Sequence, residues 1–431
     1  MSRPSSPAVR SSRWRRMIIA GMLTLVSVTA AGLWLRGAVI AAREPQLVRR
    51  ALAAGRLDEA AQALERWLRS SPDSAEAHYF KARIAWAQND FPTVDRELAR
   101  AETLGHAWQA VARLRGLLLA RGNQLSDAEP LLRQALAGSH GFDPEVAEAL
   151  THLYLKTFRL GEAATVLDRW LREVPDDARP YLLRTEIDTR SHADPELIIA
   201  RYRGALERDP GLDQARFGLA EQLRQNHRQA EAAPEYATYL ARQPGNPLGY
   251  LGAGQNALDM GDEAEATRLL DRALTLAPHD PEVLAARATL ELHQGHLEVA
   301  LGYFDQAVKS DPFDHWNRYQ RMLVLARLGR KVEANADREA VERLKDDQTH
   351  FSEISRDLVR NPLDPQLRSE TARWLMEHGH EDEAVEWANL VLRSDPSHPA
   401  MNRLLADYYR KKGQLGLANF HETHAARHAH Q

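Results

Sequence analysis

The sequence predicts an all-α protein made of paired helices stacked in a row, and three observations lead to this prediction. First, residues 247–280 and 281–314 align without a gap, which gives the 431-residue chain an internal period of 34 residues. Second, a small or apolar residue recurs at position 20 of this period, and third, a proline recurs at position 32. A fixed period of this length is typical of repeat arrays, in which each unit buries its apolar face against its neighbours.

The period extends over most of the chain, so that eleven repeats can be numbered. Position 20 is occupied in successive repeats by Ala60, Val94, Ala128, Ala163, Ile198, Ala232, Ala266, Ala300, Ala334, Ala384 and Ala418. Position 32 is Pro72, Pro175, Pro210, Pro244, Pro278, Pro312 and Pro396 where the proline is kept. Small residues at positions 8 and 20 let the two helices of a repeat approach closely, and proline at position 32 ends the second helix because it cannot continue it.

This pattern resembles the tetratricopeptide repeat, a helix-turn-helix unit of 34 residues, over about nine tenths of the chain. The resemblance implies a right-handed α-solenoid of about eleven repeats, in which the first helix of each repeat (helix A) lines the concave side. Repeats 1–9 are expected in residues 44–346, and repeats 10 and 11 with a C-terminal cap in residues 365–431.

Two stretches depart from the pattern. Repeat five carries one extra residue, and residues 188–192 give its helix A a polar end, so its sequence departs from the pattern of a helix pair. Residues 347–364 interrupt the period; the apolar side chains between Phe351 and Val359 have the spacing of an amphipathic helix. This segment is either a degenerate half-repeat or a single inserted helix. We favour the inserted helix, together with a bend before the last two repeats.

The N-terminus carries a second strong signal. Residues 17–35 are 19 residues without a charge, which is enough for one transmembrane helix. The preceding tail, residues 1–16, contains five arginines and no acidic residue, and residues 36–43 form a linker. The excess of positive charge predicts a single-pass anchor in the cytoplasmic (inner) membrane, with the N-terminus in the cytoplasm and the repeats on the periplasmic or other extracytoplasmic side. A cleaved secretory signal ending near residues 28–30 is the alternative, but the apolar run continues past that point to Leu35.

Composition restricts the function. The chain has no cysteine, which excludes disulfides and thiolate metal sites. Residues 44–431 carry 49 basic and 60 acidic side chains, so this part of the chain has no dominant basic field that would collect nucleic acid. Catalytic and nucleotide-binding motifs are absent from the sequence, and the repeats leave no stretch long enough for an enzyme domain. We therefore expect no enzymatic activity and no cofactor.

The concave side is the expected binding surface. In the tetratricopeptide family, positions 2, 5, 9, 12 and 13 of helix A face the groove, and large aromatic and arginine side chains there are of the types that dominate binding energy at interfaces. The expected groove residues of this kind are Tyr79, Arg83, Trp86, Arg113, Arg121, His152, Phe217, Arg224, Trp316, Tyr319, Arg327, Arg373 and Arg403. They are expected to contact a protein or peptide partner, although each could instead pack between neighbouring repeats or pair with a carboxylate.

The C-terminal histidines offer a different interpretation. His421, His424 and His428 would share one face of a helix, and imidazoles at this spacing can bind zinc, copper or nickel. The alternative is a solvated last helix, which terminal repeats require.

The sequence as a whole favours a bacterial, membrane-anchored, non-enzymatic interaction scaffold. The alternatives are an accessory protein for envelope or exopolysaccharide assembly and secretion, and a metal-binding protein that uses the histidine tail. The sequence leaves the partner's identity and self-association open.

Overall fold

The computed structural model describes residues 43–138 and 141–427. All regular structure in these two ranges is helical, as the sequence predicts. The basic tail (1–16), the uncharged stretch (17–35) and the linker except Arg43 lie outside them. Within the described ranges, none of the helices combines the length and the apolar character needed to cross a membrane.

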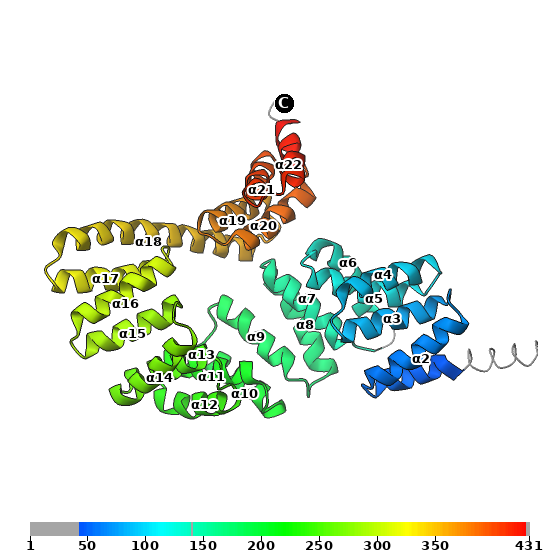
Figure 1. The fold of residues 1–431 in the computed structure, drawn as a ribbon, viewed down its shortest axis with the longest axis horizontal. Coiled ribbons are helices and arrows are strands. Elements are labelled where there is room, and N and C mark those ends of the chain that lie inside the picture. Colours follow the sequence, from blue (N-terminus) through cyan, green and yellow to red (C-terminus); the bar gives the residue numbers. More distant parts are fainter. Residues whose placement is uncertain (1–42, 139–140, 428–431) are drawn as a thin grey trace, which may run out of the picture. The chain divides into compact units, whose positions relative to one another are not determined.

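The helices alternate along the chain as helix A and helix B of successive repeats (Figure 1). A helix over residues 43–53 opens the described part. The A helices that follow are α3 (Ala75–Ala87), α5 (Trp108–Arg121), α7 (Pro144–Lys156), α9 (Arg179–Arg190), α11 (Asp213–Gln225), α13 (Pro247–Asp259), α15 (Pro281–His293), α17 (His315–Arg327), α19 (Pro365–Glu377) and α21 (Pro399–Lys411). The B helices are α2 (Leu57–Ser70), α4 (Phe91–Thr103), α6 (Leu125–Ala137), α8 (Leu160–Glu173), α10 (Pro195–Arg208), α12 (Gln229–Arg242), α14 (Glu263–Leu276), α16 (Leu297–Ser310), α18 (Lys331–Arg360), α20 (Glu381–Ser394) and α22 (Leu415–Arg427).

The chain divides into two compact units, an N-terminal unit (Met1–Gly141) and a C-terminal unit (Phe142–Gln431). The division falls inside residues 44–346, which the sequence pattern treats as one array. The sequence after α6 lacks the position-32 proline, and the C-terminal residue of the N-terminal unit, Gly141, has a φ of +101°. The core of the N-terminal unit includes a cluster in which the ring centroids of Trp67 and Phe80 lie 6.1 Å apart.

The two repeated features of the sequence have the structural roles predicted for them. All eleven side chains at position 20 are buried, and none is more than 4 % exposed. Each of the seven position-32 prolines lies two residues beyond the end of a B helix, as Pro278 does beyond α14 and Pro312 beyond α16. The tetratricopeptide-like pairing of helices is therefore confirmed in both units.

Gly254, at position 8 of its repeat, shows why the helices of a pair need small residues. A Cβ atom added to Gly254 would lie 2.8 Å from the Cγ atom of Leu270, which is at position 24 of the same repeat on α14. Such an approach is closer than van der Waals contact allows, so the backbone of α13 packs directly onto a side chain of α14.

The turn between helices A and B requires a left-handed residue in many repeats. Glycine occupies it in several of them, as at Gly261 with φ of +80°, because a glycine has no Cβ to clash. Phe158 adopts the same conformation with φ of +57°, which is uncommon for a bulky side chain. Its ring is held in place by Trp387 of α20, at a centroid distance of 5.8 Å, and by the guanidinium of Arg190 at 5.2 Å. The C-terminal unit thus brings the α7–α8 turn against α20.

Repeat five forms a helix pair despite its polar sequence, because α9 packs against α10. Asp188 is buried between them, and its carboxylate lies 3.6 Å from Arg184 and 3.3 Å from Arg201. An ion pair therefore occupies part of the interface between these helices.

The structure differs from the prediction of a separate inserted helix at residues 347–364. These residues continue the B helix of repeat nine, so that α18 is one helix of 30 residues up to Arg360. Ala334, near its start, packs in a cluster with α17, whereas Ile354 and Leu358 pack with α19, α20 and α21. No proline or glycine interrupts α18, and both of its ends are anchored, so the helix continues through its exposed middle.

Candidate functional site

A trough lies across four consecutive A helices of the C-terminal unit, α11, α13, α15 and α17. It encloses a cavity of about 480 Å³. It is lined by Phe217, Glu221, Arg224, Gln225, Leu248, Leu251, Gly252, Gln255, Glu282, Ala285, Ala286, Thr289, Asp314, Trp316 and Asn317. Most of these residues occupy positions 2, 5, 6 and 9 of their repeats, which are the same places on successive A helices.

Aromatic side chains stand at the two ends of the trough. Phe217 on α11 packs against the core, with its ring centroid 5.2 Å from that of Tyr239 and 6.3 Å from that of Tyr236. Trp316 on α17 is 55 % exposed and stacks on Tyr319 at 5.7 Å. One end therefore offers a fixed apolar surface, and the other offers an indole that is more than half exposed.

The floor between them depends on Gly252. A Cβ atom at this position would lie 2.7 Å from Cε1 of the buried Tyr236 ring and would also crowd the Glu221 carboxylate, so glycine leaves room for both side chains. Glu221 accepts hydrogen bonds from the hydroxyl of Tyr236 at 2.5 Å and from Nη2 of Arg224 at 3.0 Å. Burial, together with the neighbouring Glu221, raises the pKa of Tyr236. Tyr236 is thus a neutral donor that fixes the Glu221 side chain.

Glu282 on α15 lies in a different electrostatic environment. Its side chain is solvent-accessible, but the surrounding protein partly desolvates it. This desolvation, and then the carboxylates of Asp280, Asp314 and Glu221, raise the pKa of Glu282. Among the described residues, Glu282 has no cationic side chain close enough for an ion pair.

Three of the thirteen predicted groove residues line this trough, namely Phe217, Arg224 and Trp316, and Tyr319 supports the last of them. Arg224 is occupied by Glu221 and by Asp259, whose Oδ2 lies 3.4 Å from Nη1.

The other predicted residues also lie on A helices but are not gathered at the trough. In the N-terminal unit, Tyr79 stacks on His106 at 4.5 Å, Trp86 lies edge-on to Phe91 at 5.6 Å, and Arg121 lies over the same Phe91 ring at 4.5 Å. Arg83 lies 5.6 Å from the Phe80 ring centroid, and Arg113 is partly buried on α5. The remaining four side chains are exposed on α7, α17, α19 and α21; they are His152, Arg327, Arg373 and Arg403.

The sequence analysis missed the polar side chains of the trough. Glu221, Gln255 and Thr289 occupy position 9 of three successive repeats, and Glu282 occupies position 2. The rule that selected Phe217 and Trp316 by position would have found them. They were passed over because only aromatic residues, arginines and a histidine were taken from those positions.

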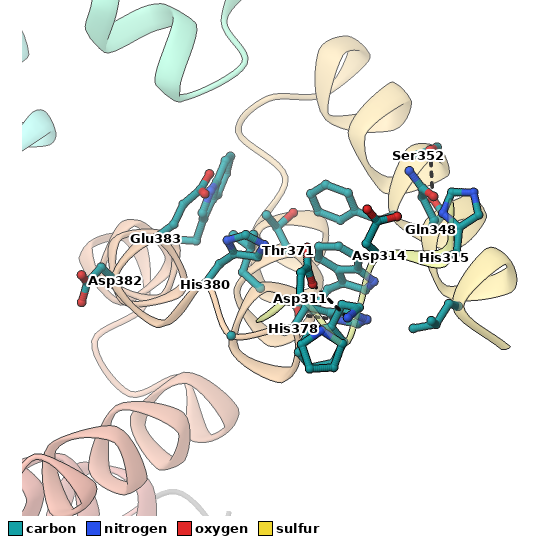
Figure 2. A pocket seen from close by; sticks show the side chains of 18 of the residues that line it. Asp311, Asp314, His315, Gln348, Ser352, Thr371, His378, His380, Asp382 and Glu383 are labelled. Carbon is teal, nitrogen blue, oxygen red and sulfur yellow. Dashed lines mark hydrogen bonds between the residues drawn. The ribbon is translucent and has the colours of Figure 1, made fainter. Parts of the chain in front are cut away.

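A second, larger cavity of about 1160 Å³ lies elsewhere in the C-terminal unit (Figure 2). Its lining includes Phe351, Trp374 and His378, whose rings stack with Trp374 in the middle, at 4.0 Å from Phe351 and 3.9 Å from His378. Phe158 and Trp387 also line it, where the α7–α8 turn meets α20. The stacked rings contact one another, so their faces are largely used in packing.

The C-terminal histidines take part in packing where they are described. His421 is 8 % exposed, its Nδ1 lies 2.9 Å from Oδ1 of Asn402, and its ring stacks on Tyr409 at 5.6 Å. Burial, and then the proximity of His424, lower the pKa of His421. His428 lies outside the described residues. In residues 43–138 and 141–427, no three histidine, aspartate or glutamate side chains are grouped so that they could hold a metal ion.

Comparisons with known proteins agree with the repeat pattern. The tetratricopeptide repeat family matches residues 46–93, 199–247, 251–315 and 118–187, together just over half of the chain. The CTR9 homolog of Arabidopsis thaliana is 25 % identical over 276 residues, which are 61 % of this chain and 25 % of that protein. The TPR repeat-containing protein PA4667 of Pseudomonas aeruginosa is 30 % identical over 169 residues, which are 38 % of this chain and 28 % of that protein. The chain thus spans about a quarter of the length of these relatives.

Comparison with solved structures found similar chains at low sequence identity. The Cut9 and Hcn1 complex of the APC/C is similar with a TM-score of 0.42 and 12 % identity, over 88 % of this chain and 87 % of the solved one. YrrB, described as a TPR protein with an unusual peptide-binding site, is similar with a TM-score of 0.32 and 20 % identity, over 42 % of this chain and 94 % of its own.

Proposed function

Because this chain belongs to the tetratricopeptide repeat family, we propose that it is a non-enzymatic scaffold that binds a partner protein through the trough on α11, α13, α15 and α17. The observation that carries this proposal is the exposed indole of Trp316 at one end of a concave surface whose other end is the Phe217 ring. Aromatic side chains in concave, partly desolvated surroundings supply much of the binding energy at interfaces.

The length of the trough matches that of a short extended peptide segment. Packed helices lie about 8–10 Å apart, so four neighbouring A helices span roughly 30 Å, and an extended chain covers this length with about nine residues. Gln255 on α13 and Thr289 on α15 lie on the two helices between those that carry the aromatic residues, and their polar groups can bond to the backbone of such a segment.

Removal of the exposed indole tests the proposal. Trp316→Ala is expected to weaken capture of the partner by the full-length chain by at least tenfold, because interface tryptophans are worth about 2 kcal/mol or more. Trp108→Ala is the matched control, because Trp108 is 47 % exposed, lies at the start of α5 and does not line the trough. Capture is measured by quantitative mass spectrometry of co-purified proteins. Equal loss in both variants, or no loss in Trp316→Ala, would contradict the proposal.

The proposal also includes a location at the membrane. The uncharged stretch 17–35 and the arginine-rich tail before it support a single-pass anchor in a bacterial inner membrane, with the repeats on the extracytoplasmic side. The full-length chain is expected to remain with membranes after an alkaline carbonate wash, and a chain lacking residues 17–35 to be released. Release of the full-length chain by the wash would argue against an anchor. A role in envelope or exopolysaccharide assembly is compatible with this location. The identity of the captured partner would test this role.

A further inference from the structure

The trough is acidic, and its charges are not equally engaged. It is lined by three carboxylates, those of Glu221, Glu282 and Asp314, and by one cationic group, that of Arg224. Asp314 caps α17, because its Oδ1 accepts hydrogen bonds from the backbone N–H groups of Trp316 at 2.7 Å and Asn317 at 3.2 Å. Glu221 is bound by Tyr236 and Arg224. Two of the three carboxylates therefore have roles within the fold.

Glu282 has no such role. Its carboxylate makes no ion pair with another described residue, and its raised pKa means that the folded protein disfavours the ionised form. A group of this kind destabilises the protein slightly at pH values above its pKa, because the unfolded chain holds the charge at lower cost. The position is thus poor for stability, but it supplies an unpaired carboxylate in the same trough as the exposed Trp316 side chain.

We propose that the segment bound in the trough is basic, with an arginine or lysine that pairs with Glu282 and lies against Trp316, and an apolar residue that packs on Phe217. The inference rests on the proposed function and names the chemistry of the partner. Two interactions favour a guanidinium there: the unpaired carboxylate attracts it, and the exposed face of the indole accepts it through a cation–π contact. Among the described residues that line the trough, Arg224 alone is cationic, and it is already paired with Glu221 and Asp259.

Peptide selection on the full-length chain tests this inference. A phage-displayed library of random nonapeptides is selected on the immobilised wild-type chain, and the enriched sequences are synthesised and measured by fluorescence anisotropy. We expect enriched peptides to contain more arginine and lysine than aspartate and glutamate. Glu282→Gln is expected to weaken their binding about fivefold, the size of a partly exposed ion pair, and added salt to reduce the difference. Glu298→Gln, at an exposed position on α16 outside the trough, is the matched control and is expected to have no effect.

The possible outcomes separate the inference from the proposed function. Suppose that the selected peptides lose binding to Trp316→Ala but have no excess of basic residues, or bind Glu282→Gln as tightly as the wild type. The inference of a basic partner would then be wrong, and the trough would remain the binding site. Peptides that bind a Phe217→Ala/Trp316→Ala variant as well as the wild type would overturn the proposed function itself. A synthetic peptide of residues 1–16 serves as a competitor; if it binds more tightly than every selected peptide, the occupant is the chain's own tail and the partner proposed here is wrong. Circular dichroism of Glu282→Gln is expected to show no loss of stability.

Discussion

Replacement of Trp387 by alanine is expected to lower the free energy of unfolding of the C-terminal unit by about 4 kcal/mol. Trp387 on α20 is 3 % exposed and packs in a core cluster with Ile354, Leu375 and Val391. Its ring also contacts Phe158, which joins the α7–α8 turn to α20. The truncation would therefore leave a cavity between α18, α19 and α20 and also release the strained aromatic turn.

Hydrogen exchange measured by mass spectrometry on the full-length chain checks this prediction. The protection of α18, α19 and α20 should fall strongly, while the helices of the N-terminal unit keep theirs, because repeat proteins are stabilised by contacts between neighbours. Trp108→Ala, at a position that is 47 % exposed, serves as the control and should change little. A loss of less than about 1 kcal/mol in Trp387→Ala would mean that the side chain is not buried as described.

The second large effect is expected at Asp337. Asp337→Ala should cost about 3 kcal/mol, because it removes the buried carboxylate that the partly buried guanidinium groups of Arg318 and Arg321 share. Asp337 on α18 is 2 % exposed and accepts two hydrogen bonds from Arg321 on α17, at 2.7 Å from Nε and 2.6 Å from Nη2. Nη1 of Arg318 lies 3.5 Å away. The hydrogen bonds that Arg321 donates to Asp337 are also the main reason that the pKa of Arg321 is raised.

Asp305 provides a matched control for Asp337, because it is a second partner of the same arginine. Its carboxylate lies 3.3 Å from Nη1 of Arg321, but its side chain is 55 % exposed. Asp305→Ala is expected to cost less than about 1 kcal/mol, since exposed ion pairs contribute little. Urea unfolding followed by circular dichroism measures both variants. Equal losses in the two variants would show that burial of Asp337 does not decide the effect.

The helix pairs could be predicted from the sequence because their determinants are local and repeated. Ala266 and Ala300 are 34 residues apart and are both fully buried, and the prolines end the B helices at the same distance each time. The contact between Phe158 and Trp387 could not be predicted. This contact depends on the accumulated rotation between successive repeats. The spacing of residues in the sequence does not predict that rotation.

The continuous α18 was missed for a different reason. A break in the 34-residue period was interpreted as the start of a separate element, although the residues between Lys331 and Arg360 contain no helix-breaking residue. The spacing of apolar residues indicates where side chains pack, at Ala334 and again at Ile354. It does not indicate whether the helix is continuous between these two positions.

The candidate site was predicted in part. Phe217, Arg224 and Trp316 were found because family positions on helix A were combined with residue type. Tyr79 and Trp86 meet the same criteria, but their rings pack against His106 and Phe91 of their own unit. Which aromatic side chains stay open depends on their neighbours in space, and a single sequence does not contain this information.

The central claim, that the trough holds a partner segment, is tested most directly by site-specific photocrosslinking. A benzophenone amino acid is placed at Gln255, which lines the trough on α13, or at Gln306, which is exposed on α16 and outside the trough. The account predicts that the purified partner of the full-length chain forms an adduct from position 255 and that the adduct disappears in the Trp316→Ala background. Adducts of equal yield from both positions, or from position 306 alone, would contradict it.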